Sequence, residues 1–171
     1  MIKSQKKLAE LGKALKEGRS TDIQGIVKNL RDAEPFEGAL KLLAMFYDRS
    51  SDESLKHVIS LFFNDMKERS GRQEVIDSVR AVSSQSTKAM LISSCWQSGL
   101  DYSEYALTIG GVFIEGDYMT SLECFTVLDT CSLMIAESDK SQIIDMLQAV
   151  IDSFATDKQK LARELIKLLS D

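Results

Sequence analysis

Apolar residues recur three and four positions apart along almost the whole chain. Between residues 53 and 67 they fall at Leu55, Val58, Ile59, Phe62 and Met66. This spacing places them on one face of an α-helix, because about 3.6 residues make one turn. Further stripes with this period are Ile23/Ile26/Val27/Leu30, Val75/Ile76/Val79/Val82, Ile143/Leu147/Val150/Ile151/Phe154 and Leu161/Leu165/Leu168/Leu169.

Helix start signals stand between the stripes. A capping box, Ser or Thr followed three positions later by Glu or Gln, satisfies free N–H groups at the beginning of a helix. Matches occur at 21–24, 50–53, 70–73 and 156–159, with an Asp variant at 139–142. Pro35 precedes Phe36, Leu40 and Leu43, where a first-turn proline is tolerated.

Stripes and start signals together predict ten helices, beginning near residues 5, 22, 37, 53, 73, 88, 104, 119, 141 and 158. Their mean spacing is 17 residues, or 34 for a helix pair. Connections this short make neighbouring helices pack roughly antiparallel. We therefore expect a single all-α domain over residues 1–171, an α-solenoid of about ten short helices arranged as stacked hairpins.

The segment from Leu107 to Leu128 allows a second interpretation. Residues 110–114 and 125–128 are apolar enough to be strands on either side of a Gly116-Asp117 turn. The helical spacing of Tyr105, Ile109, Val112 and Phe113 favours helix instead, and so do the two apolar faces of residues 122–134, typical of a buried middle helix. Gly110-Gly111 then marks a kink or a close approach between helices.

Composition excludes several classes of protein. One Pro, nine Gly and 44% hydrophobic residues argue against disorder and against a turn-rich all-β fold. The three cysteines, Cys95, Cys124 and Cys131, are odd in number and contain no CxxC pair. We expect them to be reduced and buried in a cytoplasmic protein. The N-terminal residues lack the apolar run of a signal peptide, and no segment is apolar enough to span a membrane.

The net charge of −5 is unevenly distributed. Residues 1–31 contain eight Lys/Arg and three acidic residues, whereas Asp101 to Asp152 contain ten acidic residues and only one base, Lys140. Solvated helix faces account for many such runs. The functional interpretation is an acidic surface that attracts a basic partner. The basic first helix could contact a membrane or a nucleic acid, but we favour a capping helix with a polar outer face.

The helix-turn-helix series from Ala39 to Leu128 resembles HEAT-like and armadillo-type helical repeats, most clearly over residues 91–102 and the hairpin that follows. The resemblance implies an α-solenoid that binds another molecule along an extended surface. Tetratricopeptide repeats share the 34-residue period, but here Trp96 is followed by Gly99, Leu100 and Tyr102, which is out of register with their signature.

Candidates for catalysis are few. His57 is the only histidine, and it lies off the apolar face of its helix. No metal-binding motif and no phosphate-binding glycine loop occurs, and the paired His and Glu residues of HEAT-like metal hydroxylases are missing. We expect no catalytic residue, no metal and no cofactor.

The leading hypothesis is a non-enzymatic scaffold that binds a partner protein along its acidic surface. The residues expected near that contact surface are Trp96, Gln97, Asp101, Tyr102, Glu115, Asp117 and Tyr118. Two alternatives stay open at this point: Trp96 could fill the core at a hairpin turn, and Asp101 could serve only to begin a helix.

The alternative functional hypothesis is a HEAT-like DNA-repair glycosylase or another nucleic-acid-binding repeat protein. The resemblance implies for it a basic groove with aromatic and acidic residues around the lesion. A net charge of −11 over residues 32–156 would repel phosphate, so nucleic acid is the less favoured partner.

Overall fold

A computed structural model describes residues 1–33 and 35–170, in which ten α-helices follow one another. Their bounds are α1 Gln5–Glu17, α2 Ser20–Leu30, α3 Ala39–Arg49, α4 Glu53–Asn64, α5 Arg72–Ala81, α6 Gln85–Gln97, α7 Ala106–Glu115, α8 Tyr118–Thr130, α9 Glu137–Val150 and α10 Thr156–Ser170. Short 3-10 turns are η1 Arg69–Gly71, η2 Ser103–Tyr105, η3 Ser132–Met134 and η4 Ile151–Ser153.

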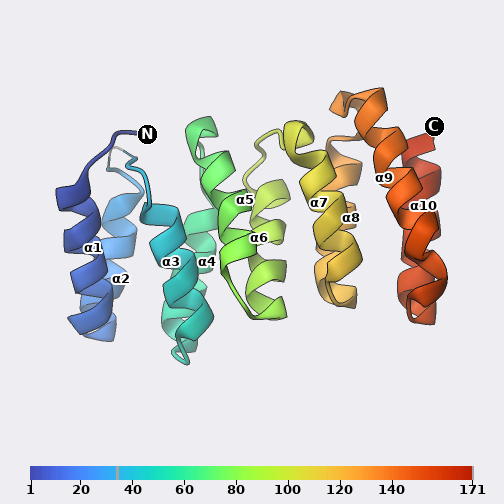
Figure 1. Cartoon of the computed structure of the whole chain (residues 1–171). Helices are drawn as coiled ribbons and strands as arrows, with labels where there is room; N and C mark the ends of the chain where they lie inside the picture. Colours follow the sequence, from blue (N-terminus) through green and yellow to red (C-terminus); the bar gives the residue numbers. More distant parts are fainter. Residues whose placement is uncertain (34, 171) are drawn as a thin grey trace.

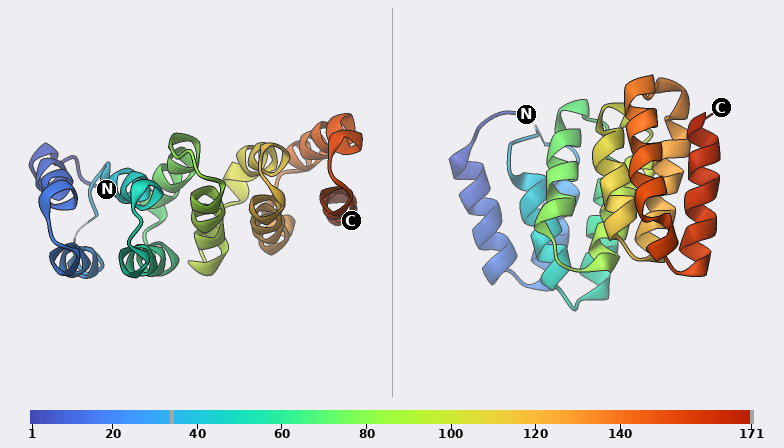
Figure 2. Two further views of the ribbon diagram at one scale, coloured as in Figure 1. Left: turned by 90° about the horizontal axis from the view of Figure 1, so that it is seen from below. Right: turned by 45° about the vertical axis from the view of Figure 1, so that its right-hand side comes forward.

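The helices form two layers, with the odd-numbered helices in one and the even-numbered helices in the other (Figures 1 and 2). The helices pack against their hairpin partners and, except for α5 and α7, against the helix two positions along, as in α3 with α5 and α6 with α8. One continuous cluster of buried apolar side chains extends from Leu11 in α1 to Leu169 in α10. The all-α array of sequential helix pairs that the periodicity predicts is confirmed.

The predicted helix starts lie within four residues of those observed, and the first and last α-helices begin at residues 5 and 156. The disputed segment is helical, in α7 and α8, so the strand interpretation is excluded there. Within residues 1–33 and 35–170, no helix has the length and apolar character needed to cross a bilayer.

The capping boxes lie within a few residues of the observed helix starts, but the residues that cap these helices are different ones. Helix α2 begins after Arg19, which makes no side-chain cap, so Thr21 lies inside the helix. Asp52, and not Ser50, caps α4 by accepting hydrogen bonds from the N–H groups of Ser54 and Leu55. Helix α9 starts at Glu137, before the Asp139 box. A capping box therefore locates a helix start only to within a few residues here.

Pro35 also has a different role from the one predicted. It lies four residues before α3, and its carbonyl oxygen accepts a hydrogen bond of 3.0 Å from the N–H of Ile2. The chain then forms an isolated parallel bridge between Ile2 and Phe36. The N-cap residue of α3 is Gly38, whose left-handed φ of 89° glycine adopts without strain.

Several helix starts are satisfied by side chains from a neighbouring helix pair. The carboxylate of Glu74, in α5, accepts hydrogen bonds from the N–H groups of Gly38 and Lys41 at 3.0 and 2.9 Å, at the start of α3. The carboxylate of Asp48, in α3, accepts from the N–H groups of Ser83 and Ser84 at 3.0 and 3.1 Å, just before α6. These bonds fix the position of each pair relative to its neighbour.

Two basic side chains join later pairs in the same way. The guanidinium of Arg72, in α5, donates to the Asp101 carbonyl and forms an ion pair of 2.8 Å with Glu104, before α7. Lys158, only 8% exposed in α10, donates to the carbonyl oxygens of Ile114 and Gly116 at 2.8 and 2.6 Å, at the end of α7. Lys158 is thus a structural cation and not part of a basic surface.

The carboxylate of Asp48 makes stability depend on acid pH. Burial raises its pKa, but hydrogen bonds led by that from Ser83 outweigh burial and leave the pKa below the ordinary value of 3.8. A lowered folded-state pKa contributes stability above pH 3.8, and this contribution is lost as the pH falls further. We expect Asp48→Asn to be less stable than the natural protein at pH 7 in urea unfolding, with the difference shrinking below pH 3.8. A difference that stays constant down to pH 2 would contradict this role.

Candidate functional site

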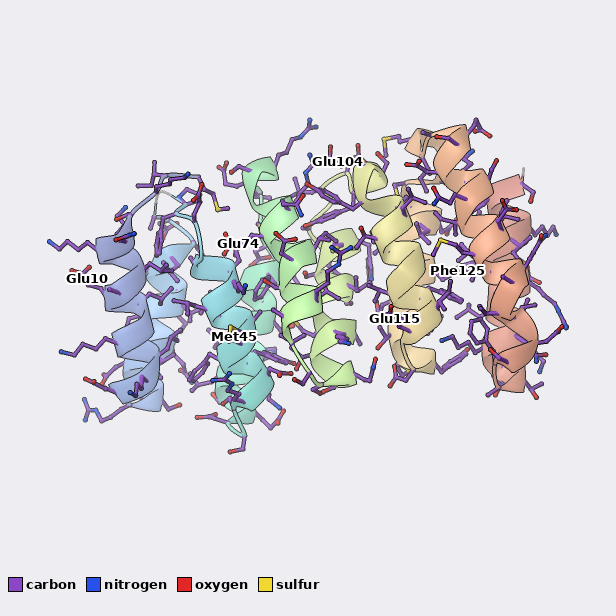
Figure 3. The ribbon with its side chains drawn as sticks, viewed as in Figure 1. Glu10, Met45, Glu74, Glu104, Glu115 and Phe125 are labelled. Atoms are coloured by element: carbon purple, nitrogen blue, oxygen red, sulfur yellow. The ribbon has the colours of Figure 1, made fainter. Side chains whose placement is uncertain are left out.

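The structure divides the seven predicted contact residues between two edges of the array. Trp96, Gln97, Asp101 and Tyr102 belong to the edge at which α6 ends, whereas Glu115, Asp117 and Tyr118 belong to the edge at which α7 ends and α8 begins. Figure 3 shows this separation through Glu104, in η2 just before α7, and Glu115, at the end of α7. Ten helical residues separate the edges by about 15 Å. The seven residues do not make one patch.

Tyr102 does not lie on a surface. Its side chain is 1% exposed and packs against Tyr105, with ring centroids 5.9 Å apart. Burial raises the pKa of its hydroxyl far above the ordinary value of 10.0. The expectation that Tyr102 contributes to a contact surface is corrected for this reason: the ring closes the core beneath the loop between α6 and α7.

Asp117 caps α8, and Asp101 bonds to the short turn before α7. The carboxylate of Asp101 accepts a hydrogen bond of 2.8 Å from the N–H of Ser103, in η2. The carboxylate of Asp117 accepts one of 2.8 Å from the N–H of Thr120, and this bond lowers the pKa of Asp117. Asp101 thus bonds to the turn before α7, although the N-cap residue of that turn is Tyr102. Glu115, Asp117 and Tyr118 remain exposed at the lower edge of Figure 1.

Trp96 lies at the surface and does not fill the core. Its side chain is 38% exposed, and its indole N–H donates a hydrogen bond of 2.8 Å to Glu123 Oε2, in α8. The bond ties the ring to the neighbouring helix and fixes its orientation. A large aromatic side chain is thus held in place with part of its area open to solvent.

Polar and apolar groups of α4 and α6 continue the surface around Trp96. The amide of Gln97 accepts a hydrogen bond of 2.7 Å from Asn64 Nδ2, in α4, and donates one of 2.8 Å to Ser93 Oγ, one turn earlier in α6. Leu61 lies on the same face of α4 as Asn64 and is 40% exposed. We define the Trp96 surface as Leu61, Ser93, Trp96, Gln97 and Glu123.

Acidic residues predominate in the helices that follow Trp96, while Lys67 brings one cation to the end of α6 by donating to the Ser98 carbonyl at 3.4 Å. Residues 89–139 extend from α6 to the start of α9 and contain eight acidic residues but no Lys, Arg or His. Glu104 is paired with Arg72, and Glu137 with Lys140, both at under 3 Å. Glu123 forms no ion pair among the described residues, and its carboxylate lies at the edge of the Trp96 ring.

Sequence reasoning missed Glu123 and Leu61. Apart from the two bonds of Lys158, side-chain hydrogen bonds between helix pairs join residues 27 to 36 positions apart, and Trp96 to Glu123 is the shortest of these separations. An acidic residue about one helix-pair period away from Trp96 in the sequence was therefore a candidate hydrogen-bond partner for its indole. The 34-residue period of the sequence is the signal that could have pointed to it.

The cysteine thiols are poorly suited to act as nucleophiles. All three cysteines are buried, and burial raises the pKa of Cys95 to about 12 and that of Cys131 to about 11. Such thiols stay protonated at neutral pH and are poor nucleophiles. His57 lies exposed on α4, and residues 1–33 and 35–170 contain no group of three or more His, Cys, Asp or Glu that could hold a metal ion.

Comparison with family models, with curated proteins and with solved structures finds no match to this chain. Its description rests on its own residues: an all-α protein, with ten helices in the described part, that packs in sequential pairs and belongs to no identified family.

Proposed function

We propose that this chain is a HEAT-like α-solenoid that acts as a non-enzymatic scaffold and binds another protein through the Trp96 surface. The repeated packing of helix pairs supports the solenoid, because each pair buries its apolar face only against its neighbours. Such an array offers an extended surface for contacts and needs no catalytic group.

The exposure and fixed orientation of Trp96 carry the proposal. It is the only tryptophan of the chain. A tryptophan usually buries most of its area, and tryptophan is enriched among the residues that dominate binding energy at protein interfaces. Because Glu123 already holds the ring, little rotational freedom is lost when a partner covers it.

The acidic surroundings specify the chemistry of the partner. A Lys or Arg side chain can stack its cationic group on the exposed Trp96 ring while pairing with the carboxylate of Glu123. Leu61 adds apolar area beside them. We expect a partner protein that presents a basic residue next to an apolar one.

Trp96→Ala and Glu123→Lys test this function. Affinity purification from the native cell, followed by mass spectrometry, should recover a partner with the natural chain and lose it with both variants. Removal of a tryptophan anchor worth about 2 kcal/mol weakens binding about 30-fold. Glu10→Lys is the control, because Glu10 is exposed on α1, in the other layer of the array from the Trp96 surface. Thermal unfolding of each variant shows that the array is intact.

The outcome that contradicts this function is a partner that both variants bind as well as the natural chain does. A nucleic-acid role has a separate signature, namely salt-dependent DNA binding of micromolar affinity. The eight acidic residues and no basic residue at positions 89–139 argue against such binding.

A further inference from the structure

An apolar tip projects from the turn between α8 and α9. We define it as Leu133, 97% exposed, and Met134, 56% exposed. The residues on either side, Cys131 and Ile135, are buried, and the N–H of Met134 donates a hydrogen bond of 2.8 Å to the Cys131 carbonyl. The tip therefore stands on a base anchored in the core, and its exposure is a fixed feature of the fold.

An apolar cavity of about 200 Å³ lies near the other end of the array, where α2 and α4 end. We call it the N-terminal pocket, and its apolar lining includes Leu30, Phe36, Leu40, Phe62 and Met66. A cavity of about 150 Å³ holds benzene, so this one has room for the four carbons of a leucine side chain.

Tip and pocket lie along the same edge of the array. The even-numbered helices run in the same direction, so the ends of α2, α4 and α8 are at one edge, the upper one in Figure 1. The pocket is near one end of this edge and the tip is near the other. A two-fold rotation that brings the edges of two copies together places each tip opposite the pocket of the other copy, as in a closed isologous dimer.

Charge favours this arrangement. The first hairpin, beside the pocket, contains eight Lys/Arg and three acidic residues within positions 1–31. Asp129, Glu137 and Asp139 flank the tip, and the one base there, Lys140, is paired with Glu137 at 2.9 Å. The rim of the pocket is balanced, because Arg31 pairs with Asp65 at 2.9 Å. The electrostatic attraction therefore acts between the basic first hairpin of one copy, taken as a whole, and the acidic residues that flank the tip of the other copy.

We propose that two copies of this chain form a two-fold dimer in which the Leu133–Met134 tip of each occupies the N-terminal pocket of the other. This contact joins the edges at which the even-numbered helices end, so the end of α6, with Trp96 and Gln97, lies along the same edge between the two tip-and-pocket contacts.

Sedimentation of the full chain over a range of concentrations tests the dimer. Leu133→Asp should raise the dissociation constant at least tenfold, and the exposure of Leu133 means that the fold survives the change. Met119→Asp adds the same charge at the opposite edge and should leave the dimer unchanged. Because each copy contributes one tip, the substitution removes two tip-and-pocket contacts from each dimer.

Cysteine cross-linking tests the register. Leu133→Cys mixed with Ala33→Cys, at the lining of the pocket, should form a disulfide between the two different variants. Leu133→Cys alone should not, because the two tips lie at opposite ends of the dimer. A monomer at all concentrations, a dimer that Leu133→Asp does not weaken, or a tip-to-tip disulfide would each overturn the proposal.

Discussion

We expect Gly110→Leu to lower the free energy of unfolding by about 2–3 kcal/mol, the upper range for overpacking a core. Gly110 is buried in α7 where it meets α9, and a Cβ atom added to it would lie 3.1 Å from Ile143 Cγ1 and 3.3 Å from Cγ2. Because α9 would have to move away, the larger side chain separates the last two pairs. Chemical unfolding followed by circular dichroism measures the change.

The neighbouring glycine is the matched control. A Cβ atom on Gly111 meets nothing within 4 Å, so Gly111→Ala should raise the free energy of unfolding by about 0.5–1 kcal/mol through helix propensity alone. Ile143→Ala introduced together with Gly110→Leu should recover part of the loss, because it removes the atoms that clash. Equal effects of Gly110→Leu and Gly111→Leu would show that α7 and α9 do not meet at Gly110.

The second large effect is expected at Glu74. Glu74→Ala removes both hydrogen bonds that its carboxylate accepts at the start of α3, and bonds to a charged group are worth about 1.5–3 kcal/mol. We expect a loss of free energy of unfolding in that range. The loss should be concentrated in the first two helix pairs, where hydrogen exchange of α3 should accelerate most.

Two further variants serve for comparison with Glu74→Ala: Glu74→Gln, which keeps part of the interaction, and Glu10→Ala, which is a control. The amide of Gln retains one acceptor oxygen, so about half of the loss should remain. Glu10 is exposed on α1, as Figure 3 shows, and its replacement should change stability by no more than about 0.5 kcal/mol. If Glu74→Ala were as mild as Glu10→Ala, the carboxylate would not hold α3 in solution.

The number, order and starts of the helices follow from the sequence because they depend on local periodicity. The stripe from Leu55 to Met66 has one apolar face, and short connections leave its helix little choice of neighbour. Gly110 was also recognisable as a close approach, although the sequence could not name Ile143 as the group it approaches.

Contacts between pairs were not predictable, because they depend on how far each pair is rotated against the next. Glu74 and Asp48 look like ordinary exposed acids in the sequence, yet both satisfy the start of a helix about 35 residues away. The burial of Tyr102 and the exposure of Trp96 were not predictable for the same reason: the loop between α6 and α7 turns the tyrosine inward, and Glu123 of α8 holds the tryptophan at the surface.

Trp96 allows the proposed function to be measured at one atom. As the only tryptophan, it gives a single ¹⁹F resonance when the chain is labelled with fluorotryptophan, and no partner protein contributes to that signal. On titration with a partner recovered by affinity purification, we expect the resonance to shift saturably, in step with formation of the complex. Glu123→Lys should abolish the shift and the complex together. A complex that forms while the Trp96 resonance stays unchanged would contradict the proposal that this surface is the binding site.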